Sequence, residues 1–438
     1  MILRNLRAQV HSIPNVHRTL TYAHGNQHNR RQYCASVSSF VKQRSSLVSH
    51  STPSLPSHSC HRSYSNGSCD YLFDEDEILA RNAAREWANT SLLAKVRDMD
   101  ENSQLEESIK LELFECGFMG LEIPEEFGGL GLNFTSACLV VEEIARVDPS
   151  VAILVDIQNT LINNAVRFWG SKQLQEKWLP RLAGDVVSSF ALSESGSGSD
   201  AFSMKTVATR EDNSEYYVLN GSKLWISNAK EASVFLVFAN ADPSKGYKGI
   251  TAFMVDANSE GLTVGLPEKK LGLRASSTCP LTLEDVRVHV DDILGDEGLG
   301  YKYCIEILNE GRIGIAAQQI GIAKGCMDIT MPYLYERKQF GQAIADFQAM
   351  QHTYANLATE IHSAELMTYN ACRMKEKQIS FVKEASMAKF YASNVAERTA
   401  SKCIEMLGGV GFTRDLLVEK FYRDCKVTMI YPINFTVV

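Results

Sequence analysis

Acidic residues are missing from the first 69 positions, because Asp70 is the first aspartate or glutamate in this 438-residue chain. The same stretch holds eight Arg and Lys residues and is rich in Ser and His. An Arg-rich, Ser-rich and acid-poor N-terminus is typical of a mitochondrial transit peptide. We therefore expect residues 1–64 to direct the chain to the mitochondrial matrix. A disordered basic tail is the alternative interpretation.

Long hydrophobic runs and paired cysteines are also missing. No uncharged apolar run reaches roughly 18 residues, so we expect no membrane span. No Cys-x-x-Cys pair occurs, and no histidine falls at ligand spacing beside a cysteine, so we expect no metal site. The whole chain has a formal net charge of −8 and residues 1–64 carry +8, which leaves −16 on the rest. Such a negative body repels nucleic acid, and this excludes a DNA or RNA partner.

Helical patterns occupy the region from about residue 74 to 180. Leu105, Ile109 and Leu113 recur every fourth residue, and Gly117 is a natural end for that helix. A turn at Asp148 precedes a second apolar helical run over residues 151–169.

Short strands are predicted next, between about residues 186 and 294. Two of them flank Asn220-Gly221, a dipeptide that favours a hairpin turn. Others cover residues 206–209, 233–238, 250–255, 262–264 and 286–290. From Gly300 the pattern is helical again. The fold class expected is a multidomain α+β protein: an N-terminal helical domain (70–186), a middle antiparallel β-barrel or sandwich (187–297) and a C-terminal helical bundle (298–438).

A glycine- and serine-rich segment lies at residues 190–203 (FALSESGSGSDAFS). Glycine leaves backbone N–H groups accessible, and these with nearby hydroxyls can bind a polar ligand. By chemistry alone the segment could equally be a flexible loop.

In its specific sequence of residues this segment resembles a signature of the acyl-CoA dehydrogenase family. Four further segments carry the resemblance: residues 123–131 (IPEEFGGLG), 220–228 (NGSKLWISN), 337–341 (RKQFG) and 405–412 (EMLGGVGF). The resemblance covers residues 70–431. Residues 271–280 (LGLRASSTCP) and 308–312 (LNEGR) are most similar to the short/branched-chain branch, which oxidises 2-methylbutanoyl-CoA.

The resemblance implies FAD as cofactor, an acyl-CoA substrate, electron-transferring flavoprotein as electron acceptor and a homotetramer that shares each FAD between subunits. The implied cofactor-binding residues are Phe190, Ala191, Leu192, Ser193, Ser199, Trp225, Ile226, Ser227, Arg337, Gln348, Glu405, Met406, Leu407, Gly408 and Gly409. Without the motif, Trp225 would be a core residue, Arg337 a surface arginine, and residues 405–409 a helix-ending turn.

The implied substrate-binding residues are Ser199, Tyr247, Tyr301, Asn309, Glu310, Gly311 and Arg312. Tyr247 could instead be a strand-end aromatic, and we expect the carboxylate of Glu310 to lie on the helix surface. A charge at Arg312, on an apolar helix, requires either an internal carboxylate or a bound ligand.

The catalytic base is the point at which this chain departs from the family. The resemblance places a glutamate after Tyr431, where the sequence has Pro432, or just before Arg312, where it has Gly311. Proline offers neither a proton acceptor nor an N–H. We expect no catalytic residue at either position, low turnover, and an aberrant C-terminus after Tyr431. A non-catalytic isoform that binds FAD or acyl-CoA, or that joins active oligomers, is the alternative; a related oxidase is less consistent with the short chain.

Overall fold

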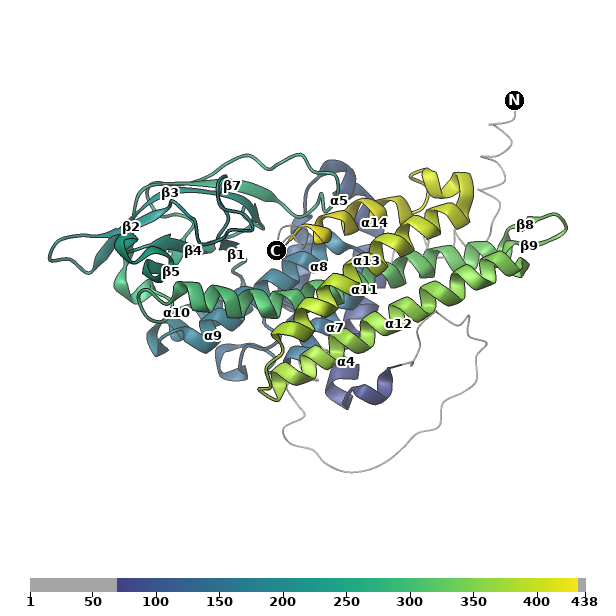
Figure 1. The fold of residues 1–438 in the computed structure, drawn as a ribbon, viewed down its shortest axis with the longest axis horizontal. Coiled ribbons are helices and arrows are strands. Elements are labelled where there is room, and N and C mark those ends of the chain that lie inside the picture. The colour runs from purple at the N-terminus through teal and green to yellow at the C-terminus, as the bar shows by residue number, and fades with distance from the viewer. Residues whose placement is uncertain (1–68, 432–438) are drawn as a thin grey trace.

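A computed structural model describes residues 69–431, and these form a helical region, a curled β-sheet and a second helical region in chain order (Figure 1). This order confirms the predicted succession of helices, strands and helices. The predicted transit peptide and Pro432 lie outside the described residues.

The N-terminal region packs seven α-helices around an apolar core. These are α4 (Glu75–Trp87), α5 (Val96–Asn102), α6 (Glu107–Glu115), α7 (Phe134–Ala145), α8 (Pro149–Asp156), α9 (Asn164–Trp169) and α10 (Lys172–Gly184). Helix α6 confirms the predicted period of four, since Ile109 and Leu113 are buried. Gly117 follows it with a φ of 77°, a conformation that glycine adopts without steric cost.

The predicted helical run over residues 151–169 is also confirmed. The side chain of Asp148 accepts a hydrogen bond from the backbone N–H of Ser150, and Pro149 is the first helical residue, as is common at helix starts. Between α8 and α9 the helix widens into a π-helix, Ile157–Asn163. Such wide turns are rare and frequently occur at functional sites.

The sheet is mixed rather than purely antiparallel, so the predicted strand directions are partly wrong. Its strands follow the order β1-β4-β2-β3-β7-β6, and β5 pairs with β4. Strand β4 runs parallel to β1 and to β2, while the other ladders are antiparallel. The bounds are β1 (Ser188–Ala191), β2 (Val207–Arg210), β3 (Tyr216–Ser227), β4 (Val234–Asn240), β5 (Ile250–Asp256), β6 (Leu262–Val264) and β7 (Thr278–His289).

The predicted hairpin at Asn220-Gly221 is wrong, because β3 runs through both residues without turning. The side chain of Asn220 instead bonds Asp285 of the neighbouring strand in both directions. A Cβ at Gly221 would lie 2.4 Å from Oγ1 of Thr206. Here the glycine allows two backbones to approach closely, and no turn is involved.

The C-terminal region is built on α11 (Gly300–Glu336), a 37-residue helix that packs against α7, α8, α12 (Gln348–Glu376), α13 (Val382–Leu407) and α14 (Val418–Cys425). A small hairpin of β8 (Lys338–Gln339) and β9 (Gln342–Ala343) joins α11 to α12. Figure 1 shows this hairpin at one end of the long axis and the sheet at the other. No helix among residues 69–431 combines the length and apolarity needed to cross a membrane.

Candidate functional site at the sheet end

The end of β1 and the end of β3 lie side by side and bring two of the predicted motifs together. The backbone N–H of Leu224 donates to the carbonyl of Ser193 at 2.8 Å. The hydroxyl of Ser189 donates to the carbonyl of Ser227. Residues 190–193 and 225–227, predicted from separate motifs, therefore lie side by side, and we call this region the Trp225 surface after its exposed residue.

Trp225 is the most unusual residue on this surface. Its φ is 63°, and the ladder between β3 and β7 shifts register between Lys223 and Ile226. A bulky residue with positive φ is strained, and bulges of this kind often lie beside active sites. The indole is 60% exposed, so Trp225 is not the core residue that its strand position alone predicts. Strain and exposure together indicate that this side chain is held outward for a ligand.

A buried ion pair, which the sequence reasoning missed, lies directly behind this surface. Nζ of Lys223 lies 2.9 Å from Oε1 of Glu194, and it also donates to the carbonyl of Leu192 at 3.1 Å. The carboxylate of Glu194 accepts two backbone N–H bonds, from Lys205 and Thr206, and the Thr206 hydroxyl. The pair thus ties the end of β1, the glycine-rich loop and the start of the β3 bulge to one point.

The protonation of this pair follows from its surroundings. Burial would raise the pKa of Glu194, but the charge of Lys223 and the hydrogen bonds from Thr206 and Lys205 outweigh burial and lower that pKa. Burial lowers the pKa of Lys223, and Glu194 opposes that shift. The available sequence signal was a lysine next to the apolar residues Leu224, Trp225 and Ile226, since a charge buried among such residues needs a partner.

Three aromatic rings from separate segments meet beside the glycine-rich loop. The rings of Tyr247 and Tyr301 contact edge to face with centroids 5.1 Å apart. Phe202 contacts both, at 6.5 Å from Tyr247 and 6.4 Å from Tyr301. Two of the predicted substrate-binding residues therefore share one aromatic wall. Ser199 is exposed, three residues before Phe202.

Helices α11 and α13 bring two cations close together, Arg312 and Lys389. Arg312 donates to the side-chain oxygen of Asn309, and within residues 69–431 it pairs with no carboxylate. Burial lowers the pKa of Arg312. Lys389 on α13 faces it, and burial together with the charge of Arg312 lowers the pKa of Lys389 to about 8. Of the two explanations left open for Arg312, an internal carboxylate is not present among these residues.

Glu310 is buried, so its expected place on the helix surface is wrong. Its carboxylate accepts from the amide of Asn164 at 2.8 Å and lies 3.3 Å from Nζ of Lys375. Burial raises its pKa to about 7, although Lys375 opposes this shift. These partners come from α9 and α12, and no local pattern in the sequence shows them. Gly311 packs against Leu161, because a Cβ there would lie 2.8 Å from Cδ2 of that side chain.

The remaining predicted cofactor residues lie far from this surface. Arg337 and Gln348 are exposed beside the β8–β9 hairpin, at the end of the molecule opposite to the sheet (Figure 1). Residues 405–409 form the end of α13, where Gly408 has a φ of 65°. Met406 and Leu407 are buried in the helical core, and Glu405 pairs with Lys402 at 2.6 Å. The helix-ending turn is therefore confirmed, and within one chain these residues do not meet Trp225.

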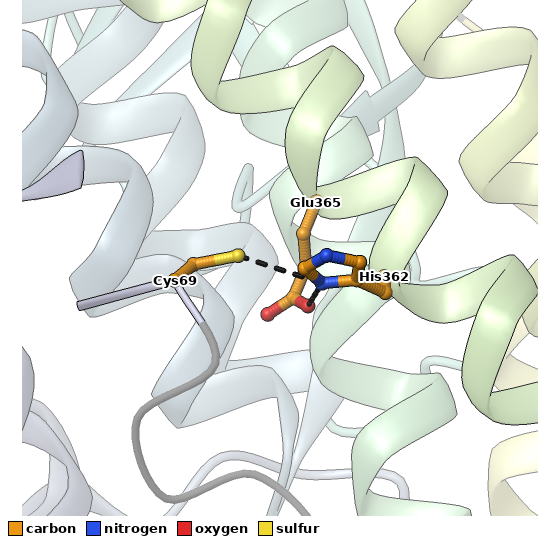
Figure 2. A group of neighbouring side chains, drawn as sticks. All are labelled: Cys69, His362 and Glu365. Carbon is orange, nitrogen blue, oxygen red and sulfur yellow. Dashed lines mark hydrogen bonds and ion pairs between the residues drawn. The ribbon is translucent and has the colours of Figure 1, made fainter. Parts of the chain in front are cut away.

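One group among residues 69–431 has side chains close enough to hold a metal ion: Cys69, His362 and Glu365. Figure 2 shows His362 joined to both other side chains, and Nδ1 of His362 lies 3.6 Å from Sγ of Cys69 and 3.5 Å from Oε2 of Glu365. The carboxylate of Glu365 already pairs with the ammonium group of Lys324, and so we assign no metal to this group.

Comparison with known proteins decides the family. The chain matches the models described as the N-terminal, middle and C-terminal domains of acyl-CoA dehydrogenase over residues 74–185, 189–286 and 298–432. It is 54% identical over 357 residues to a probable short/branched chain specific acyl-CoA dehydrogenase of Dictyostelium discoideum, covering 82% of this chain and 86% of that one. The chain belongs to the acyl-CoA dehydrogenase family.

Two further acyl-CoA dehydrogenases support this assignment. The mitochondrial short/branched chain specific enzyme of Rattus norvegicus is 52% identical over 359 residues, covering 82% of this chain and 83% of its own. The structure of butyryl-CoA dehydrogenase from Megasphaera elsdenii superimposes with a TM-score of 0.81 at 33% identity, covering 83% and 96% of the two chains. Both the sequence and the fold are therefore those of the family.

Acyl-CoA dehydrogenases are oxidoreductases that bind FAD and pass electrons to electron-transferring flavoprotein. The sheet end of this chain fits a flavin. Trp225 offers an exposed aromatic face, and both polar side-chain atoms of the buried Asn228 have no hydrogen-bond partner within residues 69–431. Buried polar groups without partners are rare in native proteins, so a ligand that reaches Asn228 would explain them.

Proposed function

We propose that this chain is built to dehydrogenate short, branched acyl-CoA thioesters of the 2-methylbutanoyl type and to pass the electrons to electron-transferring flavoprotein. The names of the relatives from Dictyostelium discoideum and Rattus norvegicus support the substrate class. The observation that carries the proposal is Trp225, which is strained, exposed and bonded through its neighbour Leu224 to Ser193.

The proposed roles of the site residues follow their places in the fold. Residues 190–193, Ser199 and residues 225–227 would hold the flavin ring, and FAD, when bound, supplies the two-electron acceptor. Tyr247, Tyr301 and residues 309–312 would contact the acyl-CoA, with Arg312 reaching its polar part. The guanidinium of Arg312 bonds Asn309 but pairs with no carboxylate among residues 69–431, and this supports the role, since a buried charge needs a counter-charge. Among these residues, the carboxylate of Glu310 is already bound to Asn164 and Lys375.

The assembly proposed is a homotetramer in the mitochondrial matrix. Arg337, Gln348 and residues 405–409 would bind the far part of an FAD that is held mainly by a second copy. The hairpin and the sheet lie at opposite ends of the molecule in Figure 1, and this separation supports a site that is shared between two copies. We further propose a leader over residues 1–64 and domains over residues 70–186, 187–297 and 298–438.

The proposed chemistry lacks its expected base. Removal of the α-proton by a general base contributes roughly 10²–10⁴-fold to such reactions. Pro432 has no side chain that accepts a proton. This specific substitution favours a second candidate function, a non-catalytic isoform that binds FAD and acyl-CoA or joins active tetramers.

The test is an anaerobic flavin spectrum of the full chain and of Pro432→Glu after addition of 2-methylbutanoyl-CoA. We expect both proteins to be yellow and Pro432→Glu to bleach at least about 100-fold faster. Pro432→Ala is the control that removes proline without adding a base, and it should stay slow. Yellow proteins that do not bleach in any variant would reject the proposed dehydrogenation. Absence of flavin in all three would reject the cofactor site at the sheet end.

A further inference from the structure

A buried aspartate packs against helix α11, about one turn from Gly311. Asp156 is the last residue of α8, next to the π-helical segment, and is 1% exposed. A Cβ at Gly314 would lie 1.9 Å from Oδ1 of Asp156, so the carboxyl group rests directly on α11. Gly314 follows Gly311 by three residues, which places both on the same side of that helix.

Tyr431, the last residue that the structure describes, also lies close to Asp156. The phenol oxygen of Tyr431 is buried, and the negative charge of Asp156 contributes to raising the pKa of this phenol. The Tyr431 hydroxyl has no hydrogen-bond partner within residues 69–431. Tyr431 and Leu161, the neighbour of Gly311, pack against the same apolar cluster. The carboxyl of Asp156 is thus flanked by the segment around position 311 and by the segment that leads to position 432.

The carboxyl group of Asp156 has few hydrogen-bond partners for a buried acid. The hydroxyl of Thr160 donates to Oδ1 at 3.0 Å, and no described residue donates to Oδ2 or forms an ion pair with the carboxyl group. The groups around it are the Thr160 hydroxyl on its own helical segment, the Tyr431 phenol, the Cys138 thiol of α7 and the Gly314 backbone of α11. None of these is a cation. Burial therefore raises the pKa of Asp156 to about 7, and only Thr160 opposes the shift.

We propose that Asp156 is the general base of this chain, with Oδ2 directed to the α-carbon of the acyl thioester. This inference rests on the proposed function. The α C–H bond breaks and its proton goes to Oδ2; the electron pair left behind forms the Cα=Cβ bond. The β C–H bond breaks in turn, and the β-hydrogen leaves with its electron pair to FAD. A base that titrates near neutral pH suits this task, and an unpaired buried carboxyl is otherwise costly.

Proton removal can be measured separately from oxidation. The probe is 3,3-dimethylbutanoyl-CoA, which has α-hydrogens but no β-hydrogen, so FAD cannot oxidise it. In D₂O we expect the full chain to exchange the α-hydrogens, at a rate that rises with pH through about 7. Asp156→Asn should lower this rate 100-fold or more, while Asp185→Asn, an exposed aspartate exchanged in the same way, should leave it unchanged.

Two further measurements separate a failure of the base from a failure to fold or bind. The double variant Asp156→Asn/Pro432→Glu should exchange again, because the glutamate replaces the lost base. In the ligand-free protein, the infrared band of protonated carboxyl groups should lose a component that titrates near pH 7 when Asp156 becomes Asn. Glu310→Gln identifies the contribution of Glu310, a second buried carboxyl whose pKa is about 7.

Each outcome decides the proposal. Exchange by the full chain that disappears in Asp156→Asn supports it. Equal exchange in both, or no exchange in the full chain while Pro432→Glu exchanges and bleaches, overturns the role of Asp156 and leaves the proposed function standing. If Pro432→Glu neither exchanges nor bleaches, the proposed function itself fails, and the role of Asp156 fails with it.

Discussion

The two ends of the molecule differ in the burial and pairing of their polar side chains. At the sheet end, Lys223 and Glu194 are buried and fully paired, and they lie behind a strained, exposed tryptophan. At the hairpin end, Arg337 and Gln348 are exposed, and no described residue bonds their side chains. Phe340 and Phe412 are also 95% and 88% exposed.

The difference shows how the two ends relate to a ligand. Preorganised polar groups with fixed partners hold a surface in one shape before the ligand arrives. The sheet end has such groups within one chain. The hairpin end offers long, unpaired side chains that can reach outward, as expected for groups that complete the site of another copy. Changes at the sheet end should therefore alter the fold and the cofactor together, and changes at the hairpin end should alter the cofactor alone.

The largest effect should come from breaking the buried pair. Lys223→Met leaves Glu194 buried without a counter-charge, and removing one partner of such a pair costs roughly 3–5 kcal/mol. We expect that loss in the free energy of unfolding by denaturant, together with release of FAD. Lys172→Met, which breaks the exposed pair with Glu176, should cost under about 1 kcal/mol.

The double variant Lys223→Met/Glu194→Gln sharpens this result. It removes both charges, so we expect it to regain part of the stability that Lys223→Met loses. If Lys223→Met unfolds like the original chain and keeps its flavin, the contrast between the two ends is wrong.

Asp156 extends the contrast, because it is buried like the sheet-end pair but lacks a cation. Its pKa is about 7 in the folded chain and 3.8 in an ordinary aspartate. As pH rises from about 4 to about 7, the carboxyl group therefore ionises in the unfolded chain but not in the folded chain, and the free energy of unfolding falls. The difference of about 3 between these two pKa values corresponds to about 4 kcal/mol. Asp156→Asn should therefore raise the free energy of unfolding by up to about 4 kcal/mol at pH 8 and by little at pH 4. Thermal unfolding at both pH values measures this, with Asp185→Asn as the exposed control. Equal stabilisation at pH 4 and pH 8 would show that the carboxyl group does not titrate in this range.

Relief of the strain at Trp225 should have a smaller effect on stability, and unlike Lys223→Met it should raise stability. Trp225→Gly accepts a φ of 63° without steric cost, and a strained residue of this kind costs about 1–3 kcal/mol. We expect the FAD-free variant to unfold at a higher temperature and to bind FAD more weakly. Trp225→Phe keeps an aromatic ring and should retain most of the affinity for FAD. A glycine variant that is less stable and binds FAD as before would remove the link between strain and ligand.

Local sequence patterns predicted what local forces determine. The period of four in α6, the end at Gly117 and the helical run after Asp148 are set by neighbouring residues, and all three are present. The motif around Trp225 identified the surface, although not the strain that shapes it. The succession of three regions followed from these patterns.

Contacts between distant segments explain the errors. The hairpin expected at Asn220-Gly221 is absent because Asp285 bonds Asn220 from another strand. Glu310 is buried because Lys375, 65 positions later, comes from α12 to meet it. The pair of Lys223 and Glu194 likewise joins two motifs that are separate in sequence. Pairing of this kind depends on the tertiary fold, which periodicity does not specify.

Arg337→Gln should have the smallest effect on the fold and tests the hairpin end directly. The guanidinium of Arg337 contacts no described partner, so we expect the free energy of unfolding of the FAD-free chain to change by less than about 0.5 kcal/mol. A charged hydrogen bond to a phosphate group is worth roughly 1.5–3 kcal/mol, so FAD affinity should fall about 10- to 150-fold. Lys338→Gln removes the neighbouring exposed charge and should change that affinity much less, because lysine lacks the planar fork that pairs with phosphate oxygens. Mixing Arg337→Gln with Trp225→Gly supplies the decisive comparison, because each copy lacks one half of a shared site and some mixed assemblies contain one intact site. The mixture should therefore regain FAD binding that is tighter than that of either variant alone. No regain of FAD in the mixture, with both variants still assembled, would mean that the hairpin end does not complete the site of a second copy.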